Sequence, residues 1–421
     1  MKQHNLIPKG ILFPFILVTS LFFAWGLANN MTDTLLAAFK KIMSMTDFQT
    51  SWIQMAFYTA YFCLALPAAI IIKKFSYKTG IVLGLIFFII GGLGFYPAGQ
   101  TMVYGHFLVT LYILAGGLSI LETSCNPYII AIGPEETATR RLNLAQSFNP
   151  IGSITGVILS KFFILSGLNV ANAMDRAEMS PEQLTQVQSS ELNAMMGPYI
   201  GVSLALCVIL LLFCIVKTPV VRDKDTNLNL WATAKRLYRN KKYFYGVIAQ
   251  FFYVGAQITV WSFTIRYAMK ELDITEEQAS NYYILSLIVF VSARFIFTAL
   301  MKYITPSKLL QIAGIMAMIC CGFVVFGSGY FGVYSLVAVS FFMSLMFPTI
   351  YGLTITGLGD DTKIAGSGHI MAILGGAIIT TLQGRASDAI GSINHSYIVP
   401  LFCFILVAAY GLYIHRAEKR W

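Results

Sequence analysis

The chain has 421 residues, of which 57% are hydrophobic and only 11% are charged, and its formal net charge is +10. Soluble domains carry roughly 25% charged residues, so this composition excludes a water-soluble protein and indicates a polytopic membrane protein. A basic excess can also indicate nucleic-acid binding. Here the cations lie beside apolar runs, where membrane topology explains them, so we expect no nucleic-acid partner.

Apolar runs of about 20 residues, the length needed to cross a bilayer, predict the transmembrane helices. Twelve such runs lie near residues 11–39, 48–72, 80–98, 104–132, 141–166, 196–217, 243–269, 276–301, 308–327, 332–357, 364–384 and 393–415. A polar and basic segment, 218–242, separates an N-terminal half, 1–217, from a C-terminal half, 243–421. The expected fold class is therefore an all-α membrane protein with two six-helix halves.

Two further features follow from this division of the chain. Segment 167–195 is predicted as the longest external loop, and a short helix inside it begins with Ser180 as cap and Pro181 at the first helical position. The first apolar run is too long for a signal peptide, so we interpret it as an uncleaved first helix.

The lysines and arginines are distributed unevenly between the two sides of the predicted spans. With the N-terminus inside, the cytoplasmic side holds both basic termini and the basic linker. The external side then keeps only Lys40, Lys41, Lys161, Arg176, Lys270 and Arg385. By the positive-inside rule, both termini are expected in the cytoplasm.

Asp33 and Glu122 are carboxylates inside the first and fourth predicted spans. Insertion of a charged side chain at the centre of the bilayer costs about 2.5–3.5 kcal/mol on insertion scales. A charged residue found there therefore marks a functional site by default. Low dielectric favours the neutral, protonated form of a carboxylic acid. We therefore expect both groups to take part in proton coupling, with Asp33 nearer the outside and Glu122 nearer the cytoplasm.

The first span places Trp25, Asn29 and Asp33 on one helical face, with Asn30 beside it. An indole followed by amide groups and an acid suits a sugar, which needs an apolar platform and hydrogen-bonding partners. The alternative is that the asparagines only bridge neighbouring helices, as polar side chains do in membranes.

Other spans carry further candidates for substrate contact. Asn126 lies one turn from Glu122 on the fourth span, and Gln146 and Asn149 lie one turn apart on the fifth. In the seventh span, Gln257 and Trp261 form one stripe with Gln250. We expect these side chains to contact a sugar, although helix packing explains Gln146 and Asn149 equally well. Arg294 is expected to pair with an acid or a carbonyl, and His369 to be a hydrogen-bonded packing residue.

The two halves show a faint internal repeat, because Glu135-Glu136-Thr137 follows the fourth span and Asp360-Asp361-Thr362 follows the tenth. Such repeats are typical of the major facilitator fold. The same alignment places Asp33 over Ile258 and Glu122 over Phe347, so the proton site is expected in the N-terminal half.

Several motifs are missing from the sequence. It contains no phosphate-binding loop of the Gly-x4-Gly-Lys-Ser/Thr type and no His-Glu-x-x-His motif. All seven cysteines fall inside predicted spans without metal-ligand spacing. We therefore expect no cofactor, no bound metal, no disulfide and no enzymatic activity.

Four stretches of the sequence together resemble a known family. They are FFAWGLANNMTDTLL (22–36), SILETSCNPY (119–128), RRLNLAQSFN (140–149) and QFFYVGAQITVWSFTIRYA (250–268). They are similar to the fucose–galactose–glucose–proton symporters of the major facilitator superfamily, and most similar to the L-fucose–proton symporter branch. The resemblance implies a multi-pass protein of the inner membrane that takes up L-fucose with a proton. It also implies that the acid at Asp33 serves proton transfer and that the acid at Glu122 serves sugar recognition.

Alternatives remain open at this stage. Within the transporter class, the chain could carry glucose, galactose or N-acetylglucosamine, and Na⁺ could replace the proton. From another class, it could be a non-transporting sensor or an intramembrane enzyme. The expected partners are a small-molecule sugar, a proton and the lipid bilayer, and we expect a monomer, as is usual in the superfamily.

Overall fold

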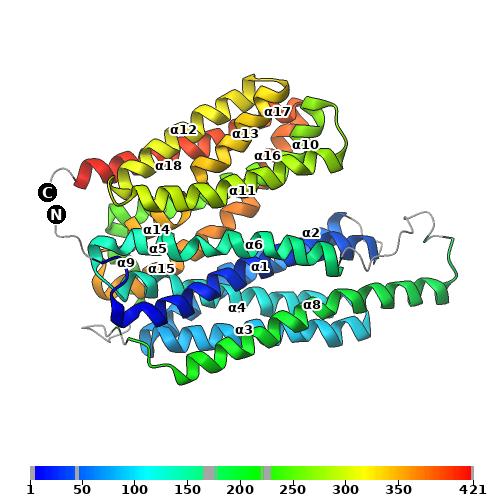
Figure 1. Ribbon diagram of the computed structural model, residues 1–421, viewed down its shortest axis with the longest axis horizontal. Helices are drawn as coiled ribbons and strands as arrows, with labels where there is room; N and C mark the ends of the chain where they lie inside the picture. Colours follow the sequence, from blue (N-terminus) through cyan, green and yellow to red (C-terminus); the bar gives the residue numbers. More distant parts are fainter. Residues whose placement is uncertain are drawn as a thin grey trace. The chain divides into compact units, whose positions relative to one another are not determined.

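The computed structural model describes residues 5–42, 47–164, 176, 178–219, 221 and 229–418. Within these ranges, the side chains of 32–41, 47–51, 54, 161, 164, 194 and 195 are not described. The described residues form helices and connecting turns, and no strand occurs among them (Figure 1).

Eleven helical stretches in the described part of the chain are long and apolar enough to cross a membrane. The first four expected spans correspond to α1 (Leu12–Ile42), α2 (Asp47–Lys74), α3 (Tyr77–Thr101) and α4 (Tyr104–Ala131). Six more correspond to α8 (Pro181–Ile215), α10 (Lys241–Leu272), α11 (Glu276–Leu300), α12 (Pro306–Phe326), the pair α13 (Gly329–Met343) and α14 (Met346–Ile355), and the run from α15 (Thr362–Met371) to α16 (Gly375–Ile390). The last contains α17 (Ile393–Ser396) and α18 (Ile398–Glu418).

The expected fifth span, 141–166, is a broken helix. It consists of α5 (Ala138–Gln146), α6 (Phe148–Leu159) and a π-helical turn, η3 (Ser160–Ile164). Pro150 explains the break at Ser147, because proline has no N–H to donate to the carbonyl four residues earlier. No single piece is long enough to cross a bilayer, although the run follows the expected position closely.

The expected external loop 167–195 is wrong over its second part, because α8 already begins at Pro181 and continues to Ile215. The predicted start is correct: Ser180 and Gln183 form a reciprocal capping box, and Pro181 is the first helical residue. The polar residues 182–193 hide this extension in the sequence, because only an apolar run was taken as a span.

The chain divides into two compact units. One comprises Phe13–Cys125 and Phe148–Val220, and the other Met1–Leu12, Asn126–Ser147 and Val221–Trp421. The predicted division into halves at 218–242 stays a prediction; within that linker the structure contains one helix, α9 (Leu230–Arg239).

In the first of these units, α1 and α6 cross with their backbones in contact. A Cβ added to Gly26 would overlap the carbonyl oxygen of Asn149, and one added to Gly152 would overlap that of Phe23. Glycines of this kind let membrane helices approach closely. The same unit pairs α3 with α8 and with α2.

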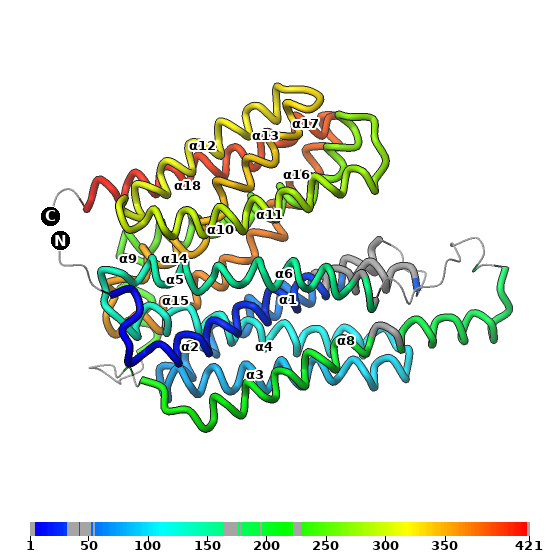
Figure 2. The backbone as a smooth tube through the Cα atoms, viewed as in Figure 1, coloured from blue at the N-terminus to red at the C-terminus, as the bar shows by residue number. Residues whose placement is uncertain are grey.

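In the other unit, α10 is the central helix and packs against α11, α13, α14, α16 and α18. The tube in Figure 2 shows α10, α11 and α13 running alongside one another. Figure 1 shows α12 beside α18, although the two are distant in sequence. This arrangement holds α10, with its polar stripe, among five other helices.

We predict that Gly26→Ala lowers the melting temperature of the purified protein. The added methyl group meets a backbone oxygen that cannot move without displacing a helix, at a cost of about 1–3 kcal/mol. Gly201→Ala is the matched control, since a Cβ at Gly201 on α8 meets nothing within 4 Å. Equal melting temperatures for the two variants would contradict this account of the crossing.

Candidate functional site

Helix α1 places Trp25 and Asn29 one turn apart on the same face, as the sequence predicts. The Trp25 side chain is 6% exposed and stacks on Phe22 with ring centroids 5.9 Å apart. Neither Trp25 Nε1 nor Asn29 Oδ1 has a hydrogen-bond partner among the described residues, although both atoms are buried. The helix therefore presents one donor and one acceptor that the described protein groups do not satisfy.

Glu122, on α4, belongs to the same unit and is 3% exposed. Its Oε2 atom is buried without a hydrogen-bond partner, and no cation of the described residues forms an ion pair with it. Tyr61, on α2, lies within electrostatic range of Glu122 and within reach of the Trp25 and Asn29 side chains. Its hydroxyl nevertheless forms no hydrogen bond of normal geometry in the described part.

These four side chains, Trp25, Asn29, Tyr61 and Glu122, form what we call the α1–α2–α4 cluster. Burying a polar group without a partner costs about 1–3 kcal/mol, so a native protein rarely leaves several together. The donors and acceptors match what a polyhydroxylated molecule offers, and Trp25 and Tyr61 add aromatic faces. The sequence analysis missed Tyr61, because one tyrosine in an apolar span gives no signal of its own.

The other predicted residues of this unit have different surroundings. The Asn30 amide donates to the Gly26 carbonyl of its own helix (3.3 Å), and the Asn149 amide donates to the Phe22 carbonyl (3.3 Å). Asn149 thus joins α6 to α1 beside the cluster. Asp33 lies on the α1 backbone, but its side chain is outside the described residues.

In the second unit, Asn126 and Gln146 form a direct amide–amide pair. Gln146 Nε2 donates to Asn126 Oδ1 at 2.6 Å, and both residues are almost completely buried. The Asn126 Nδ2 atom remains without a partner among the described groups. Gln146 thus contacts α4, whereas Asn149, one turn further along the chain, donates to α1.

The polar stripe of α10 contains Gln250, Gln257 and Trp261. Gln250 is fully buried, and neither its amide nitrogen nor its oxygen has a described partner. Gln257 is half-buried, whereas the Trp261 indole donates to Ser340 Oγ at 3.3 Å and packs on Phe290. The stripe thus offers two amide side chains for further hydrogen bonds.

Two other residues of this unit are buried and ionisable. The Arg294 guanidinium is 3% exposed, and its hydrogen bonds among the described residues go to carbonyl oxygens. Of the two expected partners, an acid or a carbonyl, the structure therefore has the carbonyl. His369 packs between Tyr243 and Tyr351. The expectation of a hydrogen bond for His369 is wrong within the described residues, because both ring nitrogens are buried without a partner.

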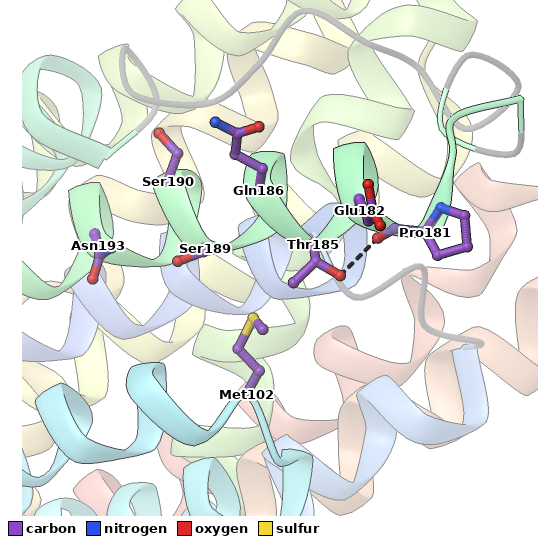
Figure 3. A pocket seen from close by; sticks show the side chains of 8 residues that line it. All are labelled: Met102, Pro181, Glu182, Thr185, Gln186, Ser189, Ser190 and Asn193. Carbon is purple, nitrogen blue, oxygen red and sulfur yellow. Dashed lines mark hydrogen bonds between the residues drawn. The ribbon is translucent and has the colours of Figure 1, made fainter.

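A surface cavity of about 880 Å³ lies where α3 ends and α8 begins, and none of the residues of the α1–α2–α4 cluster lines it (Figure 3). Hydroxyl and amide side chains from the first turns of α8 line it, with Met102 on the α3 side. None of its lining residues carries a buried polar atom that lacks a partner. The α1–α2–α4 cluster is therefore the better candidate for a substrate site than this cavity.

In the searched residues, no group of His, Cys, Asp or Glu side chains is suited to hold a metal ion.

Comparison with known proteins gives consistent matches over nearly the full chain. The model of the Major Facilitator Superfamily matches residues 15–380. The L-fucose-proton symporter of Haemophilus influenzae is 39% identical over 418 residues, covering 97% of each chain. A glucose/galactose transporter of Brucella abortus is 34% identical over 398 residues, covering 94% of this chain and 92% of the relative. The crystal structure of an Escherichia coli fucose:proton symporter superposes with a TM-score of 0.91 at 37% identity, covering 96% of this chain and 99% of that chain.

Proposed function

This chain belongs to the Major Facilitator Superfamily of membrane transporters, and we propose that it is a proton-coupled symporter that imports L-fucose or a closely related hexose. The proposal takes the sugar and the proton from the symporters that the chain resembles. It further places the protein in an inner membrane with both termini in the cytoplasm, because the basic linker and termini then lie inside.

The observation that carries this proposal is the α1–α2–α4 cluster. Four side chains from three membrane helices bring together buried polar atoms that have no described partner. A sugar supplies hydroxyl groups that both donate and accept, so it can satisfy Trp25 Nε1, Asn29 Oδ1 and the Tyr61 hydroxyl together. We assign the contacts of Glu122, Asn30, Asn126, Gln146, Asn149, Gln257 and Trp261 to the same sugar as predictions from the sequence.

Proton coupling follows from the energetic cost of carrying a charge through the membrane. In the proposed cycle, Asp33 takes a proton from outside, sugar binds, the halves rock, and both are released inside. Neutralising the carboxylate lowers the cost of its burial, which is why the proton and the sugar move together. A potential of about 100 mV supplies roughly 2.3 kcal/mol per proton, or about fortyfold accumulation of sugar.

The Brucella abortus relative favours a second candidate, transport of glucose or galactose. Coupling to Na⁺ differs in its chemistry, because the cation needs an ionised carboxylate together with carbonyl ligands. These alternatives leave the fold and the polar cluster unchanged and differ in the sugar and the ion.

The deciding experiment is counterflow of labelled sugars in proteoliposomes at several pH values, with and without Na⁺. We expect L-fucose to exchange fastest and to accumulate when the outside is acidic, without any requirement for Na⁺. Faster exchange of glucose or galactose would replace the substrate, and a strict Na⁺ requirement would replace the ion. Absence of flux for every sugar would exclude the transporter function altogether.

For Asp33→Asn, we predict that sugar exchange survives while pH-driven accumulation disappears. The amide keeps the neutral shape of the protonated acid but has no exchangeable charge state. Exchange and accumulation are measured on the same proteoliposomes, so the exchange activity controls for folding. Accumulation at the wild-type level would remove Asp33 from the proton path.

For Tyr61→Phe, we predict that the affinity for sugar falls by about threefold to tenfold, because one hydrogen bond contributes about 0.5–1.5 kcal/mol. Titration of the purified protein with L-fucose gives the dissociation constant. Tyr96→Phe is the matched control, because the Tyr96 side chain is exposed on α3 and also loses only a hydroxyl. An unchanged dissociation constant for Tyr61→Phe would place its hydroxyl outside the site.

A further inference from the structure

Arg294, on α11, is a buried cation whose hydrogen bonds go to two backbone carbonyls. Its Nε donates to Ser344 O at 2.6 Å and its Nη1 to Gln146 O at 3.0 Å, while the guanidinium lies over the Phe290 ring. Within the described chain no carboxylate pairs with it. Both carbonyls lie at helix ends: Gln146 is the last residue of α5, and Ser344 is the C-cap of α13.

Two prolines explain why these particular carbonyls need a donor. In an uninterrupted helix, each carbonyl accepts from the N–H four residues later. For Gln146 that residue is Pro150, and for Ser344 it is Pro348, and neither has an N–H. Arg294 therefore supplies donors to the two carbonyls that the prolines leave without their helical partner.

Two further contacts join α5 to α14 and α11. Asn143 Nδ2 donates to Thr349 Oγ1 at 3.1 Å, and Arg140 Nε donates to Thr298 O at 3.0 Å. Positions 140 and 143 share one helical face. Through this face α5, which belongs by sequence to the first six spans, packs against α11 and α14, which belong to the last six.

Gln146 also connects this packing to the predicted sugar contacts. Its backbone carbonyl accepts from Arg294, while its side chain donates to Asn126. A displacement of Arg294 therefore changes the position of an amide assigned to the sugar.

We infer that Arg294 is a positioning residue for transport, which holds α5 against α11 and α14 through the carbonyls that the prolines leave free. During transport, Arg294 releases the Gln146 carbonyl when α5 separates from α11 and α14. The inference rests on the proposed function for its role in transport, since alternating access requires the two six-helix halves to separate on one side at a time. Its structural part, the reversible release of α5, stands on the contacts alone.

The test measures how readily this side opens. Thr139→Cys introduces a thiol at a position that is 7% exposed and packed against Gly352 of α14. Its alkylation by N-ethylmaleimide is followed peptide by peptide in the purified, full-length protein. We expect Arg294→Lys, in this background, to raise the alkylation rate about tenfold, because a lysine lacks the planar fork that binds both carbonyls.

A second variant reaches the same contact without altering the arginine. Pro150→Ala restores an N–H that can bond to the Gln146 carbonyl and compete with Arg294, so it should also raise the rate. Arg266→Lys is the matched control. Arg266 is exposed on α10, so its substitution by lysine should leave the alkylation rate of the introduced thiol unchanged.

The native cysteines separate opening from unfolding. Cys321 and Cys403 are buried in the core of the same unit, so general unfolding exposes them together with the introduced thiol. Faster alkylation confined to the introduced thiol supports the inference. Unchanged alkylation in both Arg294→Lys and Pro150→Ala overturns it, as does an increase that Cys321 and Cys403 share.

The same variants distinguish this inference from the proposed function. Alkylation requires neither sugar nor a proton gradient, so it reports on the release of α5 even if L-fucose proves to be the wrong substrate. If alkylation responds as expected but sugar exchange by Arg294→Lys equals that of the wild type, the release occurs without limiting transport. That result would overturn the positioning role alone.

Discussion

The structure depends on one constraint: a helix that ends or breaks where water does not reach its free carbonyls must find donors for them within the protein. Buried and half-buried cations supply these donors. Arg141 is completely buried and donates to Ile129 O at 2.8 Å and Ile130 O at 2.7 Å, at the end of α4. Arg294 does the same for α5 and α13, and Lys242 donates to Thr356 O at the end of α14. Each positive charge also meets the negative end of a helix dipole.

This use of the cations has a consequence for the buried acid. The buried Arg141 and Arg294 of the second unit donate to carbonyl groups, and no cation of the described residues pairs with Glu122. A carboxylate in such a place has a low cost only when it is protonated or hydrogen-bonded to a ligand. The charges that stabilise the helix breaks therefore leave Glu122 without a compensating cation among the described residues.

The sequence predicts the spans because length and hydropathy determine them, and it predicts the Ser180 cap because capping is local chemistry. It predicts the extension of α8 poorly, since the polar residues 182–193 form a helix that the apolar criterion does not detect. The breaks at Ser147 and Ser344 were readable in principle from Pro150 and Pro348. Their common partner, Arg294, was not, because contacts between residues so far apart in sequence depend on tertiary packing. The same limit hid Tyr61, whose meaning comes from its position near Glu122 rather than from its neighbours in the chain.

The choice among hexoses depends on a different kind of contact from the one that makes the chain a sugar transporter. L-Fucose is 6-deoxy-L-galactose, so it differs from the D-hexoses in the configuration of its ring hydroxyls and also carries a methyl group in place of their hydroxymethyl group. The donors and acceptors of the α1–α2–α4 cluster can satisfy ring hydroxyls of either sugar. An apolar surface around the methyl group rejects an added hydroxyl by only about a hundredfold, whereas a buried polar partner rejects its loss far more strongly. Discrimination between L-fucose and a D-hexose therefore needs hydrogen-bonding partners placed for one ring configuration, in addition to an apolar surface at the sixth carbon.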